Sequence, residues 1–178
     1  MPNTFELTDK ALKREMTLTS ELNDQTDRGA AIVGVAWVEE EMQAAIKSFL
    51  EEDKKAWDRL FGRSGPLATL SSKIDLARLL GMCSKVIASD LHILREIRNE
   101  FAHTVVARDN SVLTFESPHV KDKCLALKCV AHEPVSDPRT AFIRACAILN
   151  ADFYMHRYFG QKVSSGGLIH ARIEQGVY

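Results

Sequence analysis

The sequence feature that most constrains the fold is a long apolar stripe with helical spacing that contains an arginine. Within residues 84–104, apolar side chains recur at the three- and four-residue intervals of a helix that packs on one face. Arg98 lies inside this stripe, about 20° from Leu91 on a helical wheel. Since a guanidinium is always charged and is rarely buried alone, we expect a carboxylate, carbonyl groups, a second subunit or a phosphate to face Arg98. The apolar members of the stripe are Ile87, Leu91, Leu94, Phe101 and Val105.

An acidic run in another predicted helix offers one possible partner for Arg98. Glu39, Glu40 and Glu41 follow one another within the periodic segment 30–52. The simplest interpretation is a solvated helix face. The alternative left open is that one of the three carboxylates pairs with Arg98.

Similar periodicity predicts helices over most of the chain. Thr26 or Asp27 is a suitable N-cap for the helix over 30–52, and Asp137 caps a last long helix with Pro138 at its first position. Gly81 is a natural residue just beyond a helix end. The remaining helices are expected over about 6–23, 54–60, 67–80, 84–104 and 118–128. The predicted fold class is therefore all-α, a single helical bundle.

The domain organisation follows from length and from the turn-forming residues. With 178 residues and 46% hydrophobic content, the chain can bury one core of ordinary size. We expect an N-terminal helical arm over residues 1–25 and a helical bundle over residues 26–160. The hinge sequence Ser164-Ser165-Gly166-Gly167 predicts a flexible C-terminal tail over residues 161–178.

Charge and composition exclude several classes of function. The formal net charge is −1, so bulk charge attracts neither nucleic acid nor anionic lipid. No apolar run reaches the length of a membrane span, and the first residues lack the pattern of a signal peptide. The four cysteines form no dense framework for disulfides. These features predict a cytoplasmic protein that has no membrane partner.

Three side chains near the end of the predicted helix 84–104 are candidate catalytic residues: Arg98, Asn99 and His103. An arginine can hold a phosphate while an imidazole moves a proton, as metal-free RNA cleavage requires. Asn99 and His103 are neighbours on the helix surface, whereas Arg98 points about 140° away from His103 on an ideal helix. Two copies meeting across a dimer cleft could combine them. The alternative is structural, with Arg98 and Asn99 bonding to neighbouring helices and His103 capping the helix end.

Further polar residues in the same region are candidate binding residues. His92 and Glu96 share the helix face of Asn99 and His103. The complete set of candidate binding residues is Asp75, His92, Arg95 and Glu96.

Residues 74–91 have the spacing of a helix-turn-helix. Small Ala77, turn-forming Gly81 and apolar Ile87 occupy the positions that this motif needs. The second helix continues to about Thr104, however, which favours two bundle helices joined at a glycine. The side chains that would face a DNA groove are Ser84, Lys85 and Ser89, of which only Lys85 is basic.

Four possible zinc ligands occur within a short span: His119, Cys124, Cys129 and His132. Their spacing is not the close Cys-x-x-Cys of zinc knuckles, and apolar residues lie between them. We therefore expect buried free thiols, with no metal and no cofactor.

Three blocks of sequence carry a family resemblance. They are Arg28-Gly29-Ala30-Ala31-Ile32-Val33-Gly34, the segment from Gly65-Pro66-Leu67 to Ile74-Asp75-Leu76-Ala77, and the segment from Asp90-Leu91-His92 to Phe101-Ala102-His103. In this order and spacing they resemble the mannitol operon repressor family (MltR-like proteins), over about residues 26–125. That family is described as helical and as repressing transcription of sugar-uptake genes, without a convincing DNA-binding domain. The resemblance implies a transcription regulator that acts through protein partners.

The block Arg98-Asn99-Glu100-Phe101-Ala102-His103 is also similar to the motif of the wider HEPN superfamily, an arginine followed after four residues by a histidine. In catalytic HEPN members the matching arginine and histidine cleave RNA in a dimer cleft. This similarity implies a HEPN-like bundle and a homodimer. We therefore predict a homodimeric regulator that binds a protein partner. The first alternative is a metal-free ribonuclease using Arg98 and His103, and the second is direct DNA binding through residues 74–91.

Overall fold

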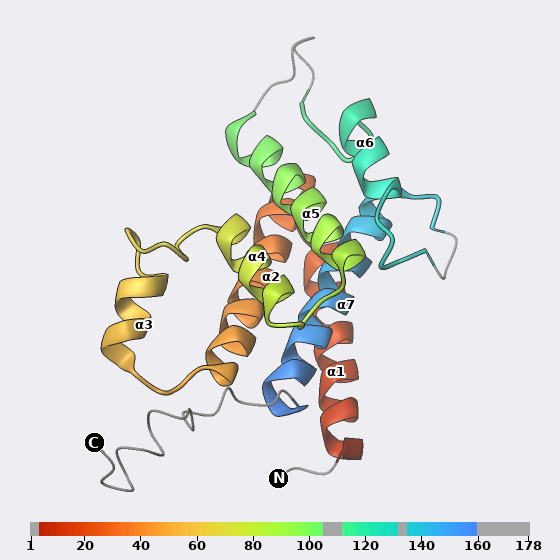
Figure 1. The fold of residues 1–178 in the computed structure, drawn as a ribbon. Coiled ribbons are helices and arrows are strands. Elements are labelled where there is room, and N and C mark those ends of the chain that lie inside the picture. The colour runs from red at the N-terminus through yellow and green to blue at the C-terminus, as the bar shows by residue number, and fades with distance from the viewer. Residues whose placement is uncertain (1–3, 105–111, 132–134, 160–178) are drawn as a thin grey trace, which may run out of the picture.

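The computed structural model describes residues 4–104, 112–131 and 135–159, which form seven α-helices and no strand (Figure 1). The all-α prediction is confirmed. The expected C-terminal tail over residues 161–178, with its hinge, lies outside the described residues. The helices are α1 (Thr4–Asn23), α2 (Asp27–Phe49), α3 (Lys54–Phe61), α4 (Leu70–Leu79), α5 (Lys85–His103), α6 (Pro118–Leu125) and α7 (Pro138–Phe159).

The two longest helices, α2 and α7, pack side by side and form the centre of the bundle. Gly34 lets them approach closely, because a Cβ atom there would lie 3.1 Å from Cys146 Sγ of α7. Helix α1 packs on α7, α5 lies against α2 and α4, and α6 lies between α5 and α7. Helix α3 has no buried residue and lies at the edge of the bundle (Figure 1), where the rings of Trp57 and Phe61 face Lys47 of α2.

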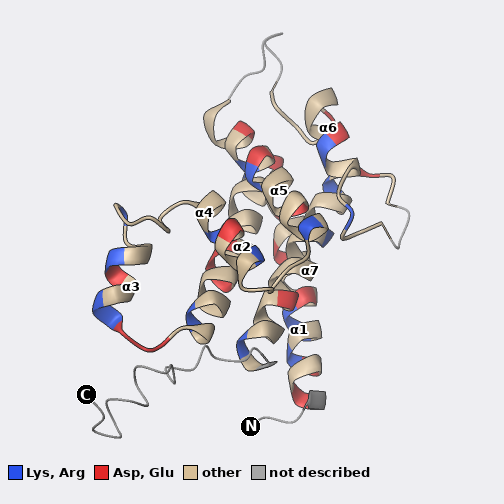
Figure 2. Ribbon diagram, viewed as in Figure 1, with Lys and Arg blue, Asp and Glu red and all other residues tan. Residues whose placement is uncertain are grey.

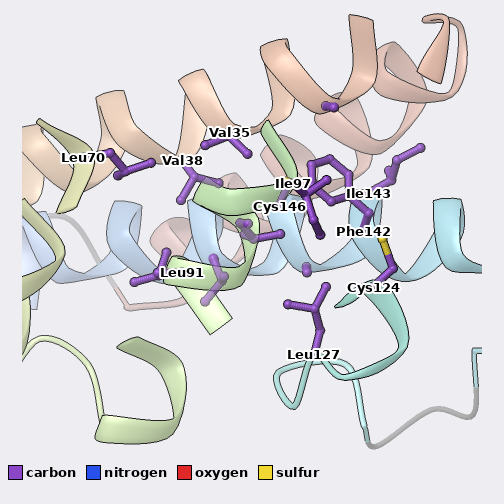
Figure 3. Close-up of a cluster of buried hydrophobic side chains, with 14 of the residues drawn as sticks. Val35, Val38, Leu70, Leu91, Ile97, Cys124, Leu127, Phe142, Ile143 and Cys146 are labelled. Carbon is purple, nitrogen blue, oxygen red and sulfur yellow. The ribbon is translucent and has the colours of Figure 1, made fainter. Parts of the chain in front are cut away.

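Apolar side chains from six helices, all except α3, meet in one core, of which Figure 3 shows a part. Three of its aromatic rings form a row, with Phe115 at a centroid distance of 5.0 Å from both Phe101 and Phe142. Each of these rings is at most 1% exposed. Phe115 belongs to the segment before α6, so this row joins that segment to α5 and α7.

Several predicted helix ends are confirmed. Thr26 Oγ1 accepts a hydrogen bond from the Gly29 amide at the start of α2. Asp137 accepts one from the Thr140 amide, and α7 begins at Pro138. A hydrogen bond from the Thr140 side chain, together with the bond from its amide, lowers the pKa of the Asp137 carboxyl. Gly81 follows α4 with a φ of 74°, a left-handed conformation that favours glycine.

Two helices are shorter than the sequence predicted. Helix α4 begins at Leu70 rather than near residue 67, because Thr69 caps it by accepting a hydrogen bond from the Ser72 amide. Helix α6 ends at Leu125 rather than near residue 128. The amides of Lys128 and Cys129 are instead bound to the carboxylate of Asp90 on α5. A partner far away in the sequence therefore takes the hydrogen bonds that would have continued α6.

The acidic run 39–41 is not the solvated face that the sequence predicted. Glu41 is only 3% exposed, and its carboxylate accepts hydrogen bonds from Arg14 of α1 at 2.7 Å and from Arg157 of α7 at 2.8 Å. Glu39 pairs with Lys73 of α4 at 2.6 Å. Because the carboxylates of Glu39 and Glu41 bind other cations, neither serves as the partner of Arg98.

Charged residues of both signs occur on the same helices. Figure 2 shows acidic and basic positions on each of α1, α3 and α5. None of the described helices is both long enough and apolar enough to cross a membrane.

Candidate functional site

The candidate residues lie on α5, and both ends of that helix are held by side chains. At its start, Ser84 Oγ accepts a hydrogen bond from the Ile87 amide at 3.2 Å. At its end, Arg28 of α2 donates to the carbonyl oxygens of Ala102 at 3.0 Å and of Thr104 at 3.5 Å. Helix C-termini carry partial negative charge, so this guanidinium stabilises the end that bears His103. Sequence reasoning placed Arg28 in a family block but assigned it no role.

Arg98 lies at the margin of the core and not within it, which corrects the prediction. The buried face of α5 also contains Ile97, which is fully buried and which the predicted stripe omitted. Including Ile97 turns the buried face away from Arg98, which is partly exposed. Arg98 has no hydrogen-bond or ion-pair partner within the part of the chain that the structure describes. The buried residues of α5 are Asp90, Leu91, Leu94, Ile97 and Phe101.

The three candidate catalytic residues do not converge within one chain. Asn99 is partly exposed and His103 is exposed. Among the described contacts, no hydrogen bond joins Arg98, Asn99 or His103 to another member of the set. Arg98 and His103 are five residues apart on one continuous helix, which separates their directions by about 140°. On an ideal helix the two side chains therefore reach a single point only through the length of the arginine or through a second copy of the chain.

The four candidate binding residues face different neighbours. His92 Nε2 lies 3.9 Å from Asp75 Oδ1, so these two join α5 to α4. Glu96 lies 3.1 Å from Lys123 Nζ of α6. The Nε atom of Arg95 is buried without a hydrogen-bond partner among the described residues. The set therefore does not form one pocket.

A charged cluster between α5 and α6 was missed by the sequence reasoning. Glu100 accepts a hydrogen bond from Lys123 Nζ at 2.5 Å and lies 2.9 Å from His119 Nε2. Burial lowers the pKa of Lys123, but its hydrogen bonds to Glu100 and Glu96 raise that pKa overall. The available signal was four-residue spacing on both helices, with Glu96 and Glu100 on one and His119 and Lys123 on the other.

The cysteines behave as core residues. Burial raises the pKa of the Cys124 thiol to about 12, and burial together with the nearby Asp90 carboxylate does the same for Cys129. His119 faces Glu100, and His132 lies outside the described residues. Over the described ranges, no three His, Cys, Asp or Glu side chains are placed to hold a metal ion. All four cysteines are free.

The segment with helix-turn-helix spacing contributes to a groove of the protein itself. Helices α4 and α5 are joined through Gly81, as the bundle interpretation expected. Lys85 and Ser89 line a groove whose opposite wall contains Ala126 and Lys128. Two of the three side chains proposed to face DNA therefore lie beside another segment of the same chain.

No protein-family model and no curated protein matches the sequence. Among solved structures, the chain is similar to a chain in the X-ray structure of the MtlR–HPr complex from Escherichia coli, with a TM-score of 0.64. The fold is MtlR-like. The similarity covers 80% of this chain and 99% of that chain at 21% sequence identity. The MtlR-like fold accords with the family resemblance of the three sequence blocks, whereas the HEPN motif stays a prediction.

Proposed function

We propose that this protein is an MtlR-like transcription regulator of sugar-uptake genes that acts through a protein partner. The observation that carries the proposal is the similarity of fold, over 80% of the chain, to a chain from the MtlR–HPr complex. That structure is a complex between proteins, which supports a protein partner for this chain as well. The formal net charge of −1 also favours protein contacts over bulk attraction to DNA.

The proposal includes a cytoplasmic homodimer. Arg98 is partly buried and unpaired within the described residues, so an acceptor on a second copy would complete its environment. The four free cysteines support a reducing compartment.

Deletion of the gene in its host tests the regulatory role. We expect transcripts of a sugar-uptake operon to rise in the deletion strain and to return to the original level when the full chain is supplied again. A transcriptome that is unchanged by deletion contradicts the proposal.

Calorimetric titration of the purified chain with HPr from the same host tests the partner, and analytical ultracentrifugation tests the dimer. Saturable binding of HPr and a sedimenting dimer are the expected results. An absence of heat at all concentrations argues against HPr as the partner, and a sedimenting monomer argues against the dimer.

A metal-free ribonuclease is the second candidate function. It is favoured by one observation: a partly exposed arginine and an exposed histidine, neither with a partner among the described residues, lie near one helix end. Across a dimer cleft, Arg98 would hold the phosphate while His103 transfers a proton.

Incubation of RNA with the full chain in the presence of a chelator tests this activity. Under the ribonuclease hypothesis the wild type cuts RNA, and Arg98→Ala and His103→Ala each abolish cutting without loss of helical content. Arg63→Ala, which changes an exposed arginine outside α5, serves as the matched control and should cut normally. RNA that stays intact with the wild-type chain excludes this function.

A further inference from the structure

A groove between α5 and the segment after α6 has the features of a peptide-binding site. Its volume is about 330 Å³, and it lies along the first turns of α5. Val86, Ile93 and Ala126 supply its apolar surface, and Lys85 and Lys128 supply cations from opposite walls. Val86 is 52% exposed, so apolar surface is open to solvent between two positive charges.

A buried carboxylate holds the two walls of the groove together. Asp90 of α5 is 1% exposed, and its Oδ2 atom accepts hydrogen bonds from the amides of Lys128 at 2.9 Å and Cys129 at 2.7 Å. Both amides belong to the segment after α6, so this one side chain ties that segment to α5. The groove is therefore built in advance of binding, which reduces the entropy that a ligand must overcome.

The two lysines of the groove belong, with Lys54 and Lys55, to the lysines that have no acidic partner among the described residues, whereas other lysines are ion-paired. Lys73, Lys121 and Lys123 each lie within 3.1 Å of a glutamate oxygen. Lys85 and Lys128 are exposed, and the described residues supply no acidic partner for either side chain. The start of α5 adds the partial positive charge of a helix N-terminus to the same region. Asp90 is the acidic residue in the lining, and its carboxylate is buried and occupied by the two amides.

We propose that this groove binds an acidic peptide segment of a protein partner. A carboxylate of the segment binds between Lys85 and Lys128, and an aliphatic or aromatic side chain packs on Val86, Ile93 and Ala126. Charge complementarity selects a negative segment, and the apolar floor selects one with an apolar anchor. This inference rests on the proposed function, because it names the chemistry of the partner through which the regulator acts.

Fluorescence anisotropy with the full chain and labelled synthetic peptides tests the proposal. The first peptide contains leucines at three- and four-residue intervals, as on one face of a helix, and glutamates between them. The second replaces each leucine by serine, and the third replaces each glutamate by lysine. We expect the first peptide to bind at least tenfold more tightly than the other two, and its affinity to fall as salt is raised. Equal affinity for all three peptides would overturn the proposal.

Charge-reversal variants locate the binding. Lys85→Glu combined with Lys128→Glu should weaken binding of the first peptide at least tenfold, and Lys85→Gln with Lys128→Gln should weaken it less. The matched control is Lys54→Glu with Lys55→Glu, a pair of exposed lysines on α3, which should leave affinity unchanged. All four positions are exposed, so circular dichroism should show unchanged helical content. Unchanged affinity in the groove variant would overturn the proposal.

Two further outcomes separate this proposal from its alternatives. Displacement of the bound peptide by a short DNA duplex would assign the groove to nucleic acid and reject the peptide. Selective peptide binding together with an unchanged transcriptome in the deletion strain would reject the regulatory role and keep the groove. Equal affinity for all three peptides together with a rise in sugar-uptake transcripts on deletion would support the regulatory role and reject the groove as a peptide site.

Discussion

At the scale of single residues, the three consecutive glutamates of α2 have three different environments. Glu39 pairs with Lys73 and Glu40 is exposed, whereas Glu41 is buried between two arginines from α1 and α7. Successive helix residues point about 100° apart, so neighbours in sequence face different elements. The burial of Glu41 depends on where α1 and α7 lie, and composition alone does not reveal it.

Glu41→Gln is expected to lower the free energy of unfolding by about 2 kcal/mol, because the buried group loses its charge while both arginines remain. Urea denaturation followed by circular dichroism measures the change. Glu40→Gln on the same helix is the matched control, and as an exposed substitution it should change stability by less than about 0.5 kcal/mol. Equal effects of the two substitutions would show that Glu41 does not hold these helices together.

At the scale of elements, close contact between α2 and α7 depends on a missing side chain. Gly34 is buried, and a Cβ there would lie 3.1 Å from Cys146 Sγ and 3.3 Å from Leu22 Cδ1. Three helices therefore meet at this glycine: α1 through Leu22, α2 itself and α7 through Cys146. The side chain of a valine at position 34 would have no space between these three helices.

Gly34→Val is expected to destabilise the protein by about 2 kcal/mol through overpacking, which outweighs the gain in helix propensity. Ala36→Val, at an exposed position of the same helix, introduces the same side chain and should cost about 0.5 kcal/mol from propensity alone. Thermal unfolding of both variants measures the difference. A Gly34→Val protein as stable as Ala36→Val would mean that α2 and α7 do not approach at this point.

At the scale of the whole molecule, the thiols link stability to pH. The pKa values of Cys124 and Cys129 are about 12, above the ordinary value near 9, because burial disfavours the thiolate. The unfolded chain then loses these protons at a lower pH than the folded chain does. The stabilisation of the folded protein by these two protonated thiols is complete below about pH 9 and is lost as the pH rises toward about 12.

The free energy of unfolding should therefore fall as the pH rises from about 9 toward about 12, as measured by urea denaturation. In the double variant Cys124→Ala with Cys129→Ala, which removes both thiols, the decline should be shallower. In the native protein at about pH 8, a thiol-specific reagent should react slowly with both cysteines and rapidly after unfolding. Identical pH profiles for the variant and the wild type would contradict these pKa shifts.

Helix α5 shows which features could be predicted from the sequence and which could not. The helix, its Ser84 cap and its turn at Gly81 follow from local chemistry and were predictable. The pairing of Glu96 and Glu100 with α6 was not predicted, although four-residue spacing on both helices was visible. The prediction placed Arg98 inside the buried face of α5, which was wrong because the predicted stripe left out Ile97. Small errors of helical phase decide whether an arginine is assigned to the core or to its edge.

The sequence by itself determined the helices and most of their ends, because periodicity and caps such as Thr26 and Asp137 act over a few residues. Only the tertiary structure decided the partners of Arg28, Glu41 and Asp90. Each of these side chains binds groups from a segment distant in the chain, as Asp90 does with the amide of Cys129. Such contacts depend on how the helices pack, and no local pattern encodes which distant amide a buried carboxylate will meet.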